Sequence, residues 1–94
     1  MFNIYVNETG NVALSGRFDA SQVESATKVL NPIQKSVYVD FKDLDYISSA
    51  GLGILIMTQK RLAETGNSLT LINVNKMIRD IFHIARFDLI FKIE

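Results

Sequence analysis

Residues 37–53 read VYVDFKDLDYISSAGLG, an apolar stretch followed by a tip rich in serine and glycine. The segment 37–41 is β-branched and aromatic almost throughout, which is typical of a central strand covered on both faces. A helix is expected from about Ser49 to Glu64, closed by Gly66, because glycine readily adopts the left-handed conformation that ends helices. A strand that leads through a short loop into a helix is the repeating unit of α/β folds.

The residues before this stretch predict a hairpin and a first helix. Apolar residues alternate with more polar ones over residues 2–6, which is the period of a half-buried strand. A tight turn then leads to a second strand at residues 12–14. Asp19 is a strong helix N-cap, and Gln22 completes a capping box. The helix that they begin is stopped by Pro32.

The residues after the stretch add a strand, a third helix and a closing segment. Residues 69–72 predict another strand, and Asn73 or Asn75 caps the helix that follows. The apolar residues of this helix share one face at helical spacing, and they are Val74, Met77, Ile78, Ile81 and Ala85. Residues 87–93 close the chain as a short apolar extended segment.

These elements follow the order β-β-α-β-α-β-α-β. We therefore predict an α/β fold in a single domain over residues 1–94, with a mixed, mostly parallel sheet and an antiparallel hairpin at the N-terminal edge. Parallel strands place functional loops at their carboxyl ends. Two predicted loops meet that condition, one from Gly16 to Asp19 and one from Asp43 to Ser49.

The composition of the chain excludes several classes of function. Its 94 residues are 48% hydrophobic, which favours one ordered core. Ten Lys+Arg balance ten Asp+Glu, so the basic footprint of a protein that binds nucleic acid or anionic membranes is absent. Zero cysteines and one histidine leave no thiolate or multi-histidine metal centre. We expect no cofactor and no metal. Because residues 1–5 lack the pattern of a signal peptide, we also expect a cytoplasmic location.

The start of the helix after the central strand departs from helix propensity. Gly51 and Gly53 lie in its first turns, where each costs about 1 kcal/mol relative to alanine. One interpretation is that a serine there is only an N-cap, worth about 1 kcal/mol. The other is a functional site, because the free N–H groups and the helix dipole at such a start favour negative charge. The spacing of the glycines is not that of a nucleotide-binding loop.

A helical wheel places apolar side chains on both sides of this helix. The larger cluster is expected to pack on the sheet, and it consists of Leu52, Leu55, Ile56, Gln59, Leu62 and Ala63. The opposite side holds Ile54 and Met57, together with Gly53, Lys60 and Arg61. A contiguous apolar patch rimmed by cations beside the serine–glycine tip indicates a surface on which another protein docks.

Two other groups of polar residues favour ordinary structural roles. Asp40, Asp43 and Asp45 have the look of a magnesium pocket, but the same spacing is typical of a solvated loop and nothing supplies a substrate phosphate. His83 falls opposite the apolar face of the third helix, which predicts a surface position. Neither an oxyanion hole nor a nucleophile elbow accompanies it as a member of a triad. We therefore expect that the protein is not an enzyme.

The residues from Asp40 to Gly53 resemble the signature of the anti-sigma factor antagonists, which have the STAS fold. Gly16-Arg17-Phe18-Asp19 resembles the Gly-x-x-Asp loop of that family, and the likeness continues through Gly66 to residues 87–91. The resemblance implies partner switching in bacteria. The unphosphorylated antagonist binds an anti-sigma factor that is also a serine kinase, which frees the sigma factor. Phosphorylation by this kinase releases the antagonist, and a phosphoserine phosphatase restores it.

The resemblance also implies roles for residues. Alignment of the family's Gly-Leu-Gly with residues 51–53 places the modified serine at Ser49, with Ser48, at the position of a family aspartate, as a secondary acceptor. The implied partner-binding residues are Gly16, Asp19, Ser48, Ser49, Ala50, Gly51, Gly53, Ile54 and Met57. The alternative is a STAS subunit of a transport or lipid-trafficking complex, which docks constitutively and needs no phosphorylation.

Overall fold

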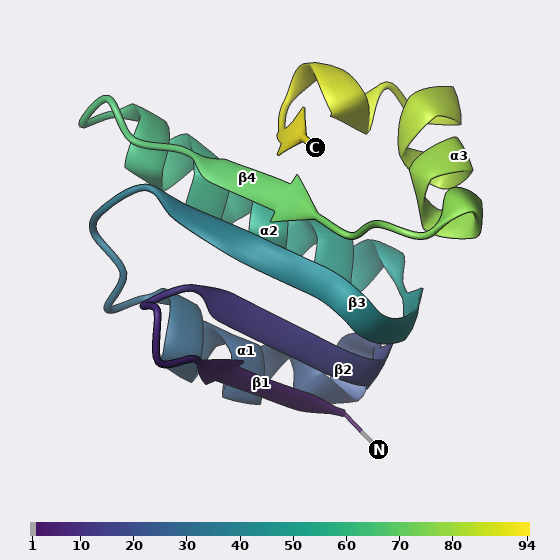
Figure 1. Ribbon diagram of the computed structural model, residues 1–94, viewed down its shortest axis with the longest axis horizontal. Helices are drawn as coiled ribbons and strands as arrows, with labels where there is room; N and C mark the ends of the chain where they lie inside the picture. Colours follow the sequence, from purple (N-terminus) through teal and green to yellow (C-terminus); the bar gives the residue numbers. More distant parts are fainter. Residues whose placement is uncertain (1) are drawn as a thin grey trace.

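The computed structural model describes residues 2–94 of the chain. Over these residues the chain forms a five-stranded sheet, three α-helices and two short 3-10 helices (Figure 1). The strands are β1 (Asn3–Val6), β2 (Val12–Phe18), β3 (Val37–Ile47), β4 (Leu69–Ile72) and β5 (Lys92–Ile93). The helices are η1 (Ala20–Gln22), α1 (Val23–Leu30), α2 (Ser49–Ala63), α3 (Lys76–Ile84) and η2 (Phe87–Leu89).

The strands lie in the order β1-β2-β3-β4-β5. β1 pairs antiparallel with β2, and the pairs β2–β3, β3–β4 and β4–β5 are parallel. Each parallel connection passes through helical structure, as the geometry of parallel strands requires. The predicted α/β fold, the order of the main elements and the antiparallel hairpin at the N-terminal edge are confirmed.

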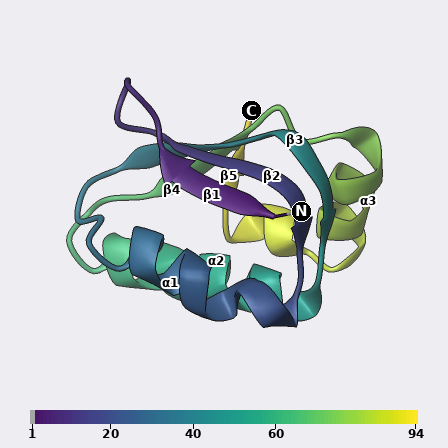
Figure 2. The ribbon, with the colours of Figure 1, turned by 90° about the horizontal axis from the view of Figure 1, so that it is seen from below.

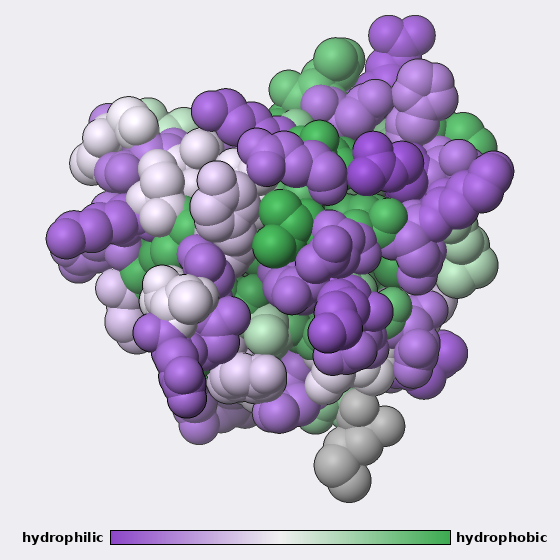
Figure 3. Space-filling model, viewed as in Figure 1, coloured by the Kyte–Doolittle hydropathy of each residue, from purple (hydrophilic) through white to green (hydrophobic). Residues whose placement is uncertain are grey.

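One face of the sheet is covered and the other is open. α1 and α2 lie side by side beneath the sheet (Figure 2), and α3 lies beyond the carboxyl end of β4 (Figure 1). The open face presents mainly hydrophilic residues, interrupted by apolar ones (Figure 3). Along β3, Val39 and Phe41 are buried whereas Tyr38 is 43% exposed. The prediction that this strand is covered on both faces is therefore wrong, because tyrosines stand where a doubly covered strand would have aliphatic residues.

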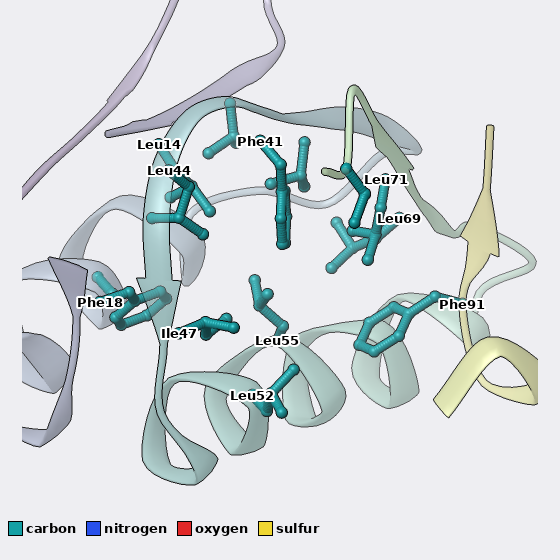
Figure 4. Packing of buried hydrophobic residues seen from close by; sticks show 14 of the residues in the cluster. Leu14, Phe18, Phe41, Leu44, Ile47, Leu52, Leu55, Leu69, Leu71 and Phe91 are labelled. Atoms are coloured by element: carbon teal, nitrogen blue, oxygen red, sulfur yellow. The ribbon is translucent and has the colours of Figure 1, made fainter. Parts of the chain in front are cut away.

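The hydrophobic core fills the space between the covered face of the sheet and the helices. Leu55 points from α2 toward Phe41 of β3, and Leu69 and Leu71 come from β4 (Figure 4). Phe82 of α3 extends the core with an edge-to-face contact to Phe41, at 6.1 Å between ring centroids. Such aromatic pairs are worth about 0.5–1.5 kcal/mol beyond the area that they bury.

β2 and β3 are both longer than the sequence predicts. Their pairing continues to Phe18 and Ile47, through two shifts of register that each insert one extra residue into β3. As a result the buried residues at the end of β3 are Phe41, Leu44 and Ile47, at a spacing of three. A spacing of three hides a strand from any search for period two. Residues 43–47 are therefore strand rather than loop, and Gly16 lies inside β2.

The C-terminal third differs from expectation in two further ways. Of the residues predicted to share one face of the third helix, Val74 and Ile78 are buried, whereas Met77, Ile81 and Ala85 are exposed. Phe82 is buried in their place, so the predicted face is only partly correct. Asn75 rather than Asn73 caps this helix, because its side chain accepts the N–H of Ile78. The closing segment is not extended throughout, since η2 precedes the two residues of β5.

The amphipathic pattern of α2 is confirmed in its main part. Leu52, Leu55 and Leu62 are buried, and Met57 is exposed. Ala63 of the predicted buried cluster is exposed, and Ile54 of the predicted exposed side is half-buried. Over residues 2–94, no helix has the length and apolar character needed to cross a membrane.

Candidate functional site

The start of α2 is built by Ser48, the only residue between β3 and α2. Its backbone is extended, as is usual for an N-cap residue. Its N–H donates to the Phe18 carbonyl at 2.8 Å. Its Oγ accepts the N–H of Gly51 at 3.2 Å, and its carbonyl accepts the N–H of Leu52 at 2.9 Å. Ser48 is half-buried and serves as the N-cap that sequence reasoning allows for one of the serines.

Ser49 is the first residue of α2, and it is exposed. Because Ser48 already caps the helix, the hydroxyl of Ser49 is not needed for that purpose. It stands at the positive end of the α2 dipole, where added negative charge is favourable. The two neighbouring serines therefore have different surroundings, with one inside the local hydrogen-bond pattern and one facing solvent.

The two glycines of α2 differ in whether the surrounding packing requires glycine. A Cβ at Gly51 would lie 3.0 Å from Cγ1 of Ile47 and 3.0 Å from Cγ of Phe18, so this buried position admits only glycine without a shift of the core. A Cβ at Gly53 would meet no atom within 4 Å. Nothing within residues 2–94 therefore requires glycine at position 53. A bare backbone there leaves room for close approach from outside the chain.

Beyond Gly53, the exposed side of α2 leads to Met57, which is 68% exposed. A shallow groove of about 280 Å³ lies between α1 and α2, and it is lined by Thr27, Asn31, Ile54, Met57, Thr58 and Arg61. Sequence reasoning placed three of these residues, Ile54, Met57 and Arg61, on one side of the helix. It missed Thr27 and Asn31, because a wheel of α2 alone gives no sign of what α1 contributes.

Arg61 has a structural task that the sequence does not reveal. Its guanidinium donates to the carbonyl of Leu30, the last residue of α1, at 3.0 Å and to the carbonyl of Ile33, just beyond that helix, at 2.8 Å. It is half-buried. Of the two cations predicted to rim the patch, only Lys60 is exposed. Arg61 instead connects α2 to the end of α1 through its hydrogen bonds.

Asp19 lies beside the start of α2, since η1, which it caps, packs against that helix. Its Oδ1 accepts the Ser21 hydroxyl at 2.6 Å and the Ser21 N–H at 3.0 Å, while Gln22 Oε1 accepts the Asp19 N–H at 2.9 Å. The predicted capping box is confirmed. The side-chain and then the backbone hydrogen bond from Ser21 hold the pKa of the Asp19 carboxyl below its ordinary value of 3.8.

Gly16 supports this region from within β2. Its φ of +81° falls in the left-handed region that favours glycine, at the second shift of register between β2 and β3. One residue further, the Arg17 guanidinium carbon lies 4.3 Å from the centre of the Tyr46 ring, a cation–π contact on the open face. The bulge thus sets how β2 approaches η1 and the tip of α2.

The other polar groups of the sequence do not join this site. Asp40 lies within β3 and accepts the Lys42 N–H and the Asn73 side-chain amide. Among residues 2–94, no group of three or more histidine, cysteine, aspartate or glutamate side chains could hold a metal ion. His83 is exposed, as predicted, and lies 3.1 Å from Asp88.

Comparison with known proteins finds a matching family model and similar proteins. The family model described as "Mlab, STAS domain" matches residues 5–92. BtrV of Bordetella bronchiseptica, named a putative anti-sigma factor antagonist, is 35% identical over 60 residues, which are 64% of this chain and 52% of BtrV. The anti-sigma-B factor antagonist of Staphylococcus aureus is 29% identical over 78 residues, which are 79% of this chain and 72% of that protein. This chain thus spans only about half the length of BtrV.

A solved structure shows the same fold. The Bacillus cell fate determinant SpoIIAA in its phosphorylated form superposes with a TM-score of 0.69 at 18% sequence identity, covering 100% of this chain and 91% of SpoIIAA. At that identity the likeness shows the fold alone.

Proposed function

The chain belongs to the STAS domain family, and on that premise we propose that it is an anti-sigma factor antagonist switched by phosphorylation of Ser49. In the unphosphorylated state it binds an anti-sigma factor with serine kinase activity and thereby frees a sigma factor. The kinase transfers phosphate to Ser49 and the complex dissociates. A phosphoserine phosphatase then returns the protein to its binding state, and the cycle takes place in the cytoplasm.

The observation that supports this proposal most strongly is the exposed Ser49 at the first position of α2. A kinase must reach the acceptor hydroxyl, and Ser49 Oγ lies outside the capping pattern that occupies Ser48. Phosphate adds about −1.5 to −2 charges and three acceptor oxygens. At a helix N-terminus this charge is favoured by the dipole, so the fold tolerates it. The modification therefore acts on the binding surface rather than on the structure of the domain.

Ser48 is the less suitable acceptor. Its Oγ accepts the Gly51 N–H, and the residue is half-buried. A phosphate on this oxygen would disturb the cap and the packing of the first turn, which costs about 1 kcal/mol or more. We assign a structural role to Ser48 and a regulatory role to Ser49. Of the two serines considered as phosphorylation sites, Ser49 is therefore the one that we propose.

The binding surface that we propose surrounds Ser49. Its exposed or half-exposed members are Asp19, Ser48, Ser49, Ala50, Gly53, Ile54 and Met57. Gly51 and Gly16 shape this surface from below, Gly51 through its close contact with Phe18 and Gly16 through its positive φ at the second register shift, where β3 carries an extra residue. The small residues around Ser49 allow a partner's backbone to come close, and Met57 offers an adaptable apolar contact.

The test is phosphorylation by candidate anti-sigma factor kinases from the same genome, with ATP and with mass spectrometry to locate the phosphate. The proposal expects modification of Ser49 in the parent protein and in Ser48→Ala, and none in Ser49→Ala. Modification of Ser48 alone, or no modification by any kinase that binds the protein, would overturn it.

The second candidate is a STAS subunit that docks constitutively. It is favoured by one observation, the serine at position 48 where the anti-sigma factor antagonists that the sequence resembles carry aspartate. Both candidates use the same surface. They differ in that a constitutive subunit binds its partner equally before and after treatment with kinase and ATP.

A further inference from the structure

β1 is an edge strand whose outer side is open. It pairs with β2, and within residues 2–94 it has no second neighbour in the sheet. The Asn7 N–H donates to the Asn11 carbonyl at 2.7 Å, so the backbone groups of Asn7 face β2. Because successive residues of an antiparallel strand turn their N–H and C=O groups to opposite sides, Asn3 and Tyr5 also face β2. The N–H and C=O groups of Ile4 and Val6 therefore point to the open edge.

This edge has few of the features by which proteins prevent pairing. Edge strands are commonly protected by lysine, proline, an inward-pointing charge or a covering loop. The four residues of β1, Asn-Ile-Tyr-Val, include no charge and no proline. Tyr5 is 49% exposed and Val6 is 50% exposed. Shortness is the only protection that the strand has.

Beneath the open edge lies a groove of about 520 Å³ between β1 and α1. Its apolar lining comes from Phe2, Ile4 and Val29. The α1 side of the groove carries one anion and one cation, Glu24 and Lys28, whose side chains lie 3.6 Å apart and are exposed. The wall is thus neutral overall, but its charge changes sign along α1.

We propose that a second copy of this chain pairs with the β1 edge, in antiparallel register about a two-fold axis perpendicular to the sheet. The exposed edge groups of Ile4 then bond those of the second copy's Val6, and the reverse, while the two Tyr5 side chains face each other on the open side of the sheet. The two five-stranded sheets become one continuous sheet. Such an interface is isologous, so each surface must complement itself.

The charges of α1 meet that requirement. α1 lies beside β1 at the same edge, and the two-fold axis reverses the direction of both elements in the second copy. Glu24 of one copy therefore comes opposite Lys28 of the other, and Lys28 opposite Glu24. A groove wall with charges of a single sign would repel its own copy, whereas this wall attracts it.

The pairing leaves the surface around Ser49 free. Ser49 follows the carboxyl end of β3, and β2 separates β3 from the β1 edge (Figure 1). A dimer of this kind carries two independent switch surfaces on one molecule. The inference therefore does not depend on the proposed function, and either can fail without the other.

The test is sedimentation equilibrium of the full chain and of charge-reversal variants, at concentrations up to about 100 μM, a range that detects micromolar association. The parent protein is expected to approach twice 10.6 kDa. Glu24→Lys and Lys28→Glu each place like charges opposite each other twice and weaken self-association by about tenfold. An equimolar mixture of the two variants restores the dimer, which shows that both variants are folded.

Asp80→Lys is the matched control, because Lys76 and Asp80 form the same kind of ion pair at 3.0 Å on α3, away from the edge. It is expected to leave the dimer unchanged. Hydrogen exchange at the amides of Ile4 and Val6 should slow as the concentration rises. A mass that stays at 10.6 kDa throughout, or a dimer that ignores both reversals and the mixture, overturns the proposal.

Discussion

At the scale of single residues, the site depends on how neighbours with similar chemistry are placed. Ser48 Oγ accepts the Gly51 N–H, whereas Ser49 faces solvent. Gly51 is enclosed by Ile47 and Phe18, whereas a Cβ at Gly53 would meet nothing within 4 Å. In each pair, one member holds the domain together and the other is free for contact with a partner. Substitutions can therefore separate stability from binding.

The two serines predict different losses of stability. Ser48→Ala removes the N-cap of α2 and is expected to lower the free energy of unfolding by about 1 kcal/mol. Ser49→Ala removes an exposed hydroxyl and should change it by less than about 0.5 kcal/mol. Urea denaturation of both variants measures the difference. Equal losses would contradict the assignment of the cap to Ser48.

The two glycines predict opposite effects. Gly51→Ala forces Cβ within 3.0 Å of Ile47 and Phe18 and should destabilise the protein by about 1–3 kcal/mol. Gly53→Ala fits open space within a helix and should stabilise it by about 0.5–1 kcal/mol. If a partner's backbone approaches Gly53, the same methyl weakens its binding. Denaturation and binding titrations on Gly53→Ala together test this, and the idea fails if the variant is more stable and binds equally well.

Asp19 predicts a dependence on pH at the acidic end. Hydrogen bonds from Ser21 lower the pKa of the folded-state carboxyl below 3.8. A group with a lowered pKa contributes stability above its unfolded-state pKa and loses it as the pH falls through the folded-state pKa. NMR titration of the Asp19 carboxyl should therefore give a midpoint below 3.8. In Ser21→Ala, which lacks the hydroxyl donor, the midpoint should rise, and an unchanged midpoint would show that the Ser21 hydroxyl does not lower this pKa.

At the scale of elements, α2 is fixed by polar side chains that its helical pattern does not explain. Gln59 Oε1 accepts the N–H of Leu69 at 2.7 Å, at the first residue of β4. Arg61 donates to two carbonyls, one from the last residue of α1 and one just beyond that helix. Gln59 stands among apolar neighbours on the helical wheel because it satisfies a backbone group of the sheet. These contacts set the position of α2, and with it the position of Ser49.

Gln59→Met keeps the size of the side chain but leaves the Leu69 N–H without its acceptor. The expected loss is about 1–2 kcal/mol of unfolding free energy, the cost of a partly buried donor without a partner. Urea denaturation measures it. The matched control is Gln34→Met, since Gln34 is exposed and its side chain should contribute less than about 0.5 kcal/mol. A similar, small effect at both positions would show that the Gln59 contact does not stabilise α2.

Sequence patterns predict elements well where one period holds and poorly where it changes. The capping box at Asp19 and the leucines of α2 each follow one local pattern, and the structure confirms them. The predicted first strand is also present as β1, but of its alternating residues only Ile4 is buried and Val6 is exposed. β3 changes its spacing of buried residues from two to three, so its second half resembles a loop in the sequence. The long-range contacts of Gln59 and Arg61 leave no local pattern at all.

At the scale of the whole molecule, the fold places the proposed binding surface at one edge. η1 and the start of α2 meet at the carboxyl ends of β2 and β3. That these two strand ends lie together could be predicted from strand order alone, since parallel strands place their carboxyl ends at one edge of the sheet. The three aspartates whose spacing suggests a magnesium pocket, and His83, are not part of the proposed binding surface. Only the packed structure shows which residues near α1 line the groove beside Met57.

The most direct test of the central claim is the affinity of an anti-sigma factor kinase for the unphosphorylated protein and for the same protein phosphorylated at Ser49. Phosphate at this surface adds charge, bulk and a desolvation cost, and a loss of about 3–4 kcal/mol corresponds to a few hundred-fold weaker binding. The backbone NMR shifts should change only near the start of α2. Equal affinity of the two forms would contradict the proposed switch.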